Sequence, residues 1–185
     1  MITIKNVKHS QFASHETNCF ECTVYWFGEK AGGADNDGRG GSTSIRWDSR
    51  DCRIDAEAWA KAQPDIVTDI PSNNDDGEFF SYPFDLESHV DQLIETYLYE
   101  RDLKNQLKRK LLIGDDDCKA GEFYTWTLSK YKGNSVADLE RVVLAGETFN
   151  NPVVLNSLPF EEALAIWRGP RWTLRNLGGR LQNLP

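Results

Sequence analysis

Long hydrophobic runs are absent from this 185-residue sequence. No apolar stretch approaches the roughly 20 residues that a membrane-spanning helix needs. The N-terminal run MITIKNVKHS also lacks the apolar core of a secretory signal peptide. We therefore expect a protein of the cytoplasm that has no membrane partner and keeps its thiols reduced.

Cysteine and histidine are scarce, with four and three residues. Cys19 and Cys22 have the CxxC spacing of zinc and redox sites. The run NCFECTVYWF is nevertheless typical of a strand, in which residues three apart face opposite sides. Because zinc requires ligands that converge, we predict that the cysteines are small core residues and that the chain holds no metal.

Several catalytic and cofactor motifs are missing too. The sequence has no GxSxG elbow, no HExxH motif, no Walker phosphate loop and no GxGxxG fingerprint. His15 and Glu16 lie near Cys19 in the sequence, so a thiol paired with a base stays open as an alternative. We expect no catalytic residues and no cofactor.

Basic residues are outnumbered by acidic ones, 21 against 29, and the formal net charge is −8. A general nucleic-acid-binding protein is expected to be basic. The C-terminal residues 168–185 are the exception, with four Arg and no acidic residue. We predict that this segment contacts a protein partner, another copy of the chain or nucleic acid through Arg171, Arg175 and Arg180.

The residues that are present predict an α+β fold, in which a small antiparallel N-terminal sheet is packed by one long helix and shorter C-terminal helices. Aromatic and β-branched residues predict strands at 2–7, 19–27, 30–34, 43–47 and 122–128. Apolar spacings of three and four predict helices at 54–63, 86–112, 136–145 and 158–168. We expect one domain over residues 1–168 and a tail or docking segment over residues 169–185.

Residues 64–85 are predicted to form a long surface loop, because three prolines and the run SNNDDGE interrupt any regular pattern. Four aromatic residues near its end are expected to fasten the loop to the core, namely Phe79, Phe80, Tyr82 and Phe84. His89 follows on the acidic half of the long helix and is expected at the surface.

Charges along the predicted helix 86–112 are ordered, with acidic residues in its first half and basic residues in its second. This order suits the helix dipole, which is a sufficient structural reason for the basic residues. An anion or nucleic-acid contact is the alternative. The candidate contact residues are Lys104, Lys108, Arg109 and Lys110.

The stretch GGADNDGRGGS at 32–42 contains five glycines and is predicted to be a flexible, irregular arm between two strands. It is interpreted as a plain hairpin loop, a phosphate nest at GRGGS, or an arm that orders on a protein partner. A calcium site in an EF-hand frame is disfavoured, because its twelfth position is Arg46 instead of Glu. The candidate contact residues are Asp35, Asn36, Asp37, Gly38, Arg39, Gly40 and Gly41.

Residues 16–41 resemble the start of small proteins encoded by bacteriophages and other mobile elements, a set with no assigned activity. In those proteins a Cys-Phe strand leads through a Gly-Lys turn to an Asn-Asp-Gly-x-Gly-Gly loop. The runs at 107–110 and 158–168 are also similar, and the position of Arg39 is often His in that set. The matching residues are Asn18, Cys19, Phe20, Gly28, Lys30, Asn36, Asp37, Gly38, Gly40 and Gly41.

The resemblance implies an origin in a phage or prophage accessory region, whose proteins often bind and disable a host factor. Our leading hypothesis is a non-catalytic accessory protein that binds and inhibits a host protein complex, with CRISPR effectors and other anti-phage defence factors as candidate targets. An acidic surface would compete there for a cationic groove.

Two alternatives remain. One is a nucleic-acid-associated protein that uses the basic helix end and the Arg-rich tail. The other is a small enzyme or nucleotide-binding protein that uses the glycine-rich stretch, through Asp35, Asp37 and Arg39, together with His15.

Overall fold

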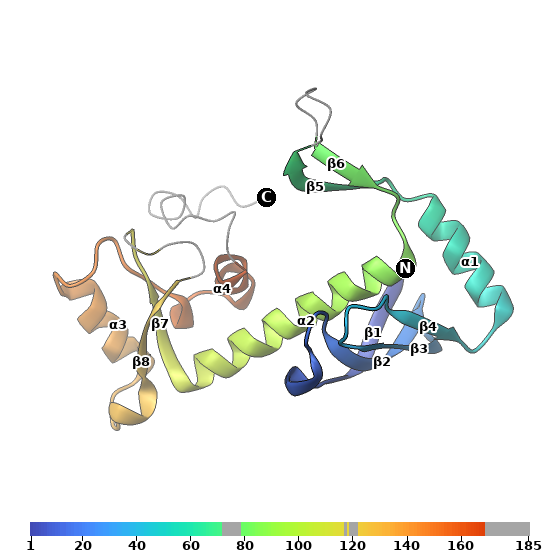
Figure 1. Ribbon diagram of the computed structural model, residues 1–185. Coiled ribbons are helices and arrows are strands. Elements are labelled where there is room, and N and C mark those ends of the chain that lie inside the picture. The colour runs from blue at the N-terminus through green and yellow to red at the C-terminus, as the bar shows by residue number, and fades with distance from the viewer. Residues whose placement is uncertain (72–78, 117, 119–121, 169–185) are drawn as a thin grey trace. The chain divides into compact units, whose positions relative to one another are not determined.

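A computed structural model describes residues 1–71, 79–116, 118 and 122–168. It confirms the α+β class, with a four-stranded antiparallel sheet and the long helix α2 (Leu86–Arg109) (Figure 1). The chain divides into two compact units, unit 1 (Met1–Thr96) and unit 2 (Tyr97–Pro185). A single domain over residues 1–168 stays a prediction, and the predicted tail with Arg171, Arg175 and Arg180 lies outside the described residues.

Unit 1 is built on an antiparallel meander. Its strands follow the order β1-β2-β3-β4 and are β1 (Ile2–His9), β2 (Cys19–Trp26), β3 (Glu29–Asp37) and β4 (Ser44–Trp47). β2 and β3 are joined by Phe27 and Gly28, which have φ angles of 46° and 89°. A turn with two positive φ angles matches the twist of paired strands. The four strands predicted for this region are confirmed, and β3 is longer than predicted.

One face of this sheet contributes to the core of unit 1. Alternate residues of β2 are buried, as expected for a strand with one covered face. Helix α1 (Arg50–Lys61) and the first turns of α2 supply the apolar side chains from the helices. The buried residues from these three elements are Phe20, Cys22, Val24, Ala56, Ala60, Leu86, Val90 and Ile94.

Two predictions for unit 1 are wrong in extent or in kind. Helix α1 begins at Arg50 instead of Ile54. Residues 64–85 contain an antiparallel hairpin of β5 (Ile66–Pro71) and β6 (Phe79–Tyr82), so they are not a structureless loop. Pro64 and Pro83 lie outside the two strands, where the missing N–H of proline removes no bond between them.

The aromatic residues of this region do not all fasten it to the core. Phe79 and Phe80 on β6 are both more than half exposed, which corrects the prediction for these two residues. Phe84 does pack inward, with its ring edge against Trp59 at a centroid distance of 5.5 Å. The number of aromatic residues in the sequence does not show which of them are exposed and which pack against the core.

Unit 2 is organised around a central strand that is buried on both faces. The sheet order is β8-β7-β9, with β7 (Lys110–Gly114), β8 (Tyr124–Thr127) and β9 (Val153–Val154). Leu112 packs in a cluster with α4 (Phe160–Trp167), whereas Leu111 and Ile113 pack in a cluster with α3 (Val136–Ala145). Neighbouring strand residues point to opposite faces, so α4 and α3 cover opposite faces of this sheet.

The predicted helix 86–112 is wrong at its C-terminal end. Helix α2 ends at Arg109, and the next five residues form β7. The amide Nδ2 of Asn156 donates to the carbonyl oxygens of Leu107 at 3.1 Å and Lys110 at 2.9 Å. Its Oδ1 accepts a bond from the backbone N–H of Leu112 at 2.9 Å. One distant side chain thus satisfies the backbone where helix changes to strand.

The start of α3 agrees with its prediction. Ser135 caps the helix by accepting the N–H of Asp138 at 3.2 Å, and Asp138 accepts the N–H of Ser135 at 3.0 Å. This reciprocal pair is a capping box, and Gly146 follows at the helix end. The signal is confined to four successive residues, which is why the sequence alone identified it.

Candidate functional site

The glycine-rich stretch is half strand and half turn. Gly32 to Asp37 belong to β3 and pair with β2, and the first four of them also pair with β4. A Cβ on Gly32 would overlap the carbonyl oxygen of Arg46 on β4. Glycine is therefore required here by close strand packing, and the predicted flexible arm from Gly32 is wrong. The last two residues of β3 lead into a short turn, and Asn36–Gly41 are called here the NDGRGG turn.

Asn36 holds the NDGRGG turn together from inside. Its side chain is buried and makes four hydrogen bonds. Its Oδ1 accepts from the Thr17 hydroxyl at 2.8 Å and from the Gly38 N–H at 2.9 Å. Its Nδ2 donates to the Gly41 carbonyl at 2.9 Å and to Thr43 Oγ1 at 3.2 Å. An amide has both donors and acceptors, so Asn satisfies all four partners at once.

Gly38 fastens the turn to the segment that precedes β2. Its carbonyl oxygen accepts the N–H groups of His15, Glu16 and Thr17 at 2.9, 3.0 and 3.4 Å. Its φ is 82°, and a Cβ there would overlap the carbonyl oxygen of Ala13. Glycine is thus required both by conformation and by contact.

Three successive backbone amides of the turn are already occupied. The N–H of Gly38 bonds to Asn36, that of Arg39 bonds to Asp37 Oδ1 at 3.1 Å, and that of Gly40 bonds to Thr17 Oγ1 at 3.4 Å. A phosphate nest needs such amides to point at the ligand. The geometry therefore disfavours the phosphate interpretation.

The carboxylates of the stretch are divided between different partners. Asp35 forms an ion pair with Arg46 of β4, while Asp37 caps the amide of Arg39. Over the described ranges, no three His, Cys, Asp or Glu side chains gather closely enough to hold a metal ion. Burial raises the pKa of the Cys22 thiol to about 11, so this thiol stays protonated at neutral pH.

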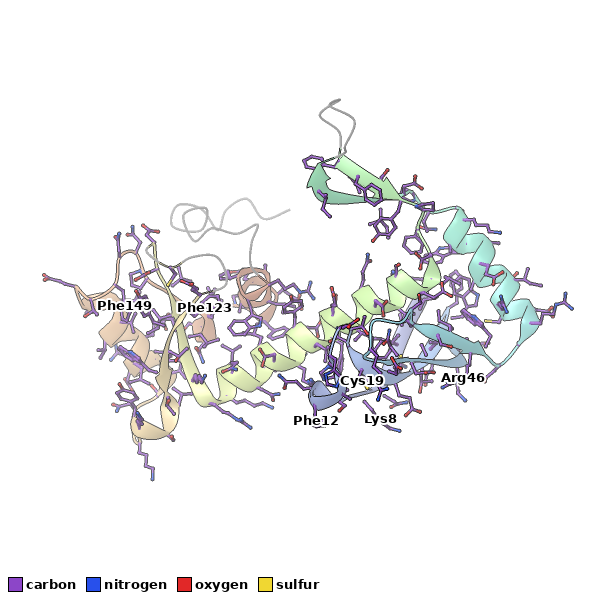
Figure 2. All side chains as sticks on the ribbon, viewed as in Figure 1. Lys8, Phe12, Cys19, Arg46, Phe123 and Phe149 are labelled. Carbon is purple, nitrogen blue, oxygen red and sulfur yellow. The ribbon has the colours of Figure 1, made fainter. Side chains whose placement is uncertain are left out.

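Two exposed side chains lie on the NDGRGG turn and on the segment before β2. Arg39 is exposed at the apex of the turn. Phe12, on the short 3-10 helix η1 (Gln11–Ala13), is 94% exposed, and Figure 2 shows it projecting at the edge of the structure. Ala13 packs directly on Gly38, so the two segments adjoin. We call Phe12, Asp37 and Arg39 the Phe12–Arg39 surface.

The sequence identified Arg39 as a candidate but missed Phe12. The available signal was a single large apolar residue inside the polar run His9–Asn18, which otherwise has no reason to contain one. The partner-binding roles of Asp35 to Gly41 stay a prediction.

An acidic hollow adjoins the NDGRGG turn. It has a volume of about 390 Å³, and its lining includes His15 and the three acidic residues Glu16, Asp91 and Glu95. Asp91 accepts a hydrogen bond from Thr43, which is itself bonded to Asn36. Burial raises the pKa of Asp91, although the bond from Thr43 opposes the shift. The hollow has a chemistry suited to a cationic group.

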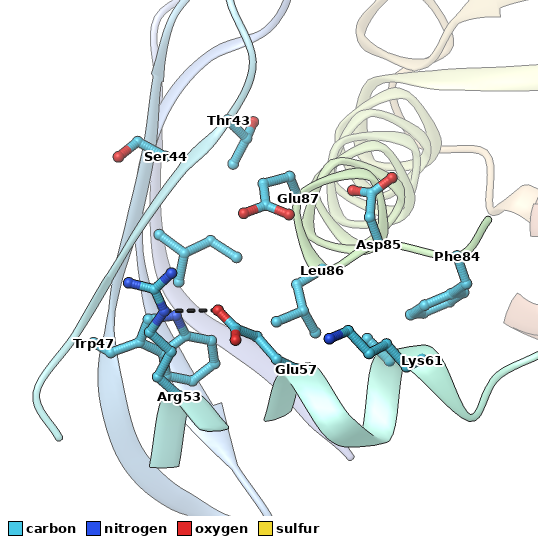
Figure 3. Close-up of a pocket in the computed structure, with 12 residues that line it drawn as sticks. Thr43, Ser44, Trp47, Arg53, Glu57, Lys61, Phe84, Asp85, Leu86 and Glu87 are labelled. Atoms are coloured by element: carbon cyan, nitrogen blue, oxygen red, sulfur yellow. Dashed lines mark hydrogen bonds and ion pairs between the residues drawn. The ribbon is translucent and has the colours of Figure 1, made fainter. Parts of the chain in front are cut away.

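A second groove in unit 1 lies between β4, α1 and the start of α2. Its volume is about 490 Å³ (Figure 3). Arg53 and Glu57 of α1 form an ion pair of 2.7 Å in it, and Lys61 and Glu87 also line it. The groove therefore contains both positive and negative side chains, and its charge does not indicate one class of ligand.

His89 is half-buried against aromatic rings, so the expected surface position holds only in part. Its ring centroid is 5.8 Å from that of Trp59 and 5.2 Å from that of Phe84. Burial lowers the pKa of His89 below its ordinary value of 6.5, because desolvation disfavours the charged imidazolium.

We expect His89 to make the protein less stable in mild acid. The unfolded chain binds the proton more tightly than the folded chain, so the free energy of unfolding falls as the pH drops through 6.5. Urea denaturation at about pH 7.5 and about pH 5.5 measures this loss. His89→Gln should show a smaller loss, and an equal loss in both proteins would refute this origin.

The basic residues at the end of α2 are placed in different environments within unit 2. Lys104 bonds to Glu100 at 3.3 Å and lies 4.6 Å from the ring centroid of Phe160. Lys110 is half-buried in β7, while Lys108 and Arg109 are exposed. Only the last two present free surface charge side by side, and a contact role for the four residues stays a prediction.

Comparisons with protein families, with curated proteins and with solved structures found no match to this chain. No helix in the described part of the chain combines the length and the apolar character needed to cross a membrane.

Proposed function

We propose that this chain is a non-catalytic, phage-type accessory protein that binds and inhibits a host protein complex, with CRISPR effectors and other anti-phage defence factors as candidate targets. The observation that carries the proposal is the 94% exposure of Phe12 on a segment fastened to the NDGRGG turn. The resemblance to phage and mobile-element proteins supplies the biological setting.

A preformed surface supports protein recognition better than a flexible arm does. Three N–H groups bonded to Gly38, together with the internal bonds of Asn36, hold Phe12 and Arg39 on a connected backbone. Ordering a loop on binding costs free energy, so a surface that is already ordered binds more tightly for the same contacts. Aromatic residues and Arg are also enriched in the contacts that dominate protein interfaces.

The same contacts weigh against the small-enzyme alternative. Asp35 pairs with Arg46, and Asp37 accepts the N–H of Arg39. The neighbouring amides of Gly38 and Gly40 bond to the side chains of Asn36 and Thr17. They do not converge on a space that a small substrate would fill. The acidic hollow beside the turn instead offers a place for a Lys or Arg of a protein partner.

Phe12→Ala is expected to weaken binding of the captured complex about 30-fold, because truncation of a buried interface aromatic typically costs about 2 kcal/mol. The tagged protein is used to capture partners from nuclease-treated bacterial lysate, and binding of the recovered complex is then measured by biolayer interferometry. Arg39→Ala should also weaken binding.

Phe27→Ala is the matched control, since Phe27 is 72% exposed in the β2–β3 turn of the same unit. Equal binding by the Phe12 and Phe27 variants would refute the proposed surface. Retained material that disappears on nuclease treatment would instead support the nucleic-acid alternative.

A further inference from the structure

The β5–β6 hairpin exposes large apolar side chains. Val67 on β5 is 64% exposed, and Phe79 and Phe80 on β6 are 54% and 53% exposed. Soluble proteins rarely leave a contiguous group of such residues in water without a binding role.

Large apolar side chains are exposed on both faces of this hairpin. Val67 pairs with Ser81, so Val67 and Phe79 share one face of the ribbon. Phe80 lies on the opposite face, with its ring 6.3 Å from that of Tyr82. A flat partner would cover only one of these faces. A partner with a cleft would cover both.

The hairpin also depends little on the rest of the described structure. Among the described elements, β5 and β6 make their only extensive contact with each other. An isolated two-stranded hairpin is marginally stable in water, so burial by a partner would stabilise it.

Charge indicates what kind of cleft would fit. Residues 62–85 contain six acidic residues and no Lys or Arg. Asp65, immediately before β5, is exposed. The sequence of this region therefore combines negative charge with aromatic rings, and single-stranded nucleic acid likewise combines negative charge with flat stacking surfaces. The acidic residues are Asp65, Asp69, Asp75, Asp76, Glu78 and Asp85.

We propose that the β5–β6 hairpin inserts into a positively charged cleft of a partner protein, of the kind that binds single-stranded nucleic acid. The inference rests on the proposed function only in taking the partner to be a protein, because the hairpin and the Phe12–Arg39 surface share no residue. Insertion blocks the cleft to nucleic acid and explains how binding leads to inhibition.

The test uses the immobilised full-length protein, nuclease-treated bacterial lysate and, as the probe, an oligothymidylate of about 30 nucleotides. The hairpin variant carries Phe79→Ser and Val67→Ser. Its matched control carries Val142→Ser and Leu144→Ser on α3, whose side chains are 60% and 57% exposed. Asp65→Lys is a second variant that reverses a charge and leaves the apolar residues in place. Urea denaturation checks that each variant folds.

Basic proteins retained by the wild type and the control should be recovered at least about tenfold less on the hairpin variant. They should also be less abundant on Asp65→Lys and be released by the oligonucleotide. Retention by all variants alike, or retention that the oligonucleotide does not reverse, overturns the proposal. A dimer seen by light scattering and lost in the hairpin variant also overturns it, since a second copy would then cover the hairpin.

The Phe12→Ala variant separates this proposal from the proposed function. If that variant retains the proteins that the hairpin variant loses, the Phe12–Arg39 surface fails and the hairpin proposal holds. If only Phe12→Ala loses them, the hairpin proposal fails.

Discussion

Gly38→Ala is expected to lower the free energy of unfolding by about 3 kcal/mol or more, because it combines a strained φ with a steric overlap. The φ of Gly38 is 82°, and an added Cβ would meet the carbonyl oxygen of Ala13 and lie 2.8 Å from the Cβ of Cys19. Relief would require separation of the NDGRGG turn from the segment that carries Phe12. Urea denaturation followed by circular dichroism measures the loss.

Gly28→Ala is the matched control for this prediction. Its φ of 89° is nearly the same, but nothing lies within 4 Å of the position that a Cβ would occupy. It should therefore cost only about 1 kcal/mol, the conformational part alone. Losses of the same size at both positions would mean that the contact with Ala13 does not hold the turn.

Asn36→Ala is expected to lower the free energy of unfolding by about 3 kcal/mol, since it leaves buried donors and acceptors without partners. The groups affected belong to Thr17, Gly38, Gly41 and Thr43. The variant should also lose binding at the Phe12–Arg39 surface, because Thr17 and Gly38 connect the two segments. Denaturation and the capture assay measure the two effects.

The neighbouring residue Asp37 provides the comparison. Its side chain is exposed and accepts one bond, from the N–H of Arg39 at 3.1 Å. Asp37→Ala should cost under about 1 kcal/mol. If the two substitutions cost the same, the buried network around Asn36 contributes no more than a surface bond, and the interpretation of the turn is wrong.

Features set by neighbouring residues could be predicted from the sequence. The capping box of Ser135 and Asp138 lies within one turn of helix, and β2 is a continuous run of strand-forming residues. Features set by distant residues could not. The end of α2 depends on Asn156, which is 46 residues from Lys110 in the sequence, and apolar spacing alone favours a longer helix.

The candidate site also combines features that neighbouring residues determine with features that distant residues determine. Glycine content correctly indicated unusual backbone at Gly38, but it suggested flexibility where the cause is close packing. In β3, Gly32 is needed because β4 passes close to it, which only the sheet pairing shows. The exposure of Phe12 depends on the hydrogen bonds that join the segment before β2 to Gly38. These bonds connect residues far apart in the sequence, so the residues around Phe12 do not predict them.

The construction of the NDGRGG turn has a consequence for variation. Asn36, Gly38 and Gly40 are constrained by buried bonds or by positive φ, whereas the Arg39 side chain makes no bond to another described residue. Position 39 is therefore expected to accept other residues at little cost in the free energy of unfolding. A library randomised at positions 12 and 39 is therefore expected to keep its fold, because it would vary the proposed contact surface without changing the buried bonds of the turn.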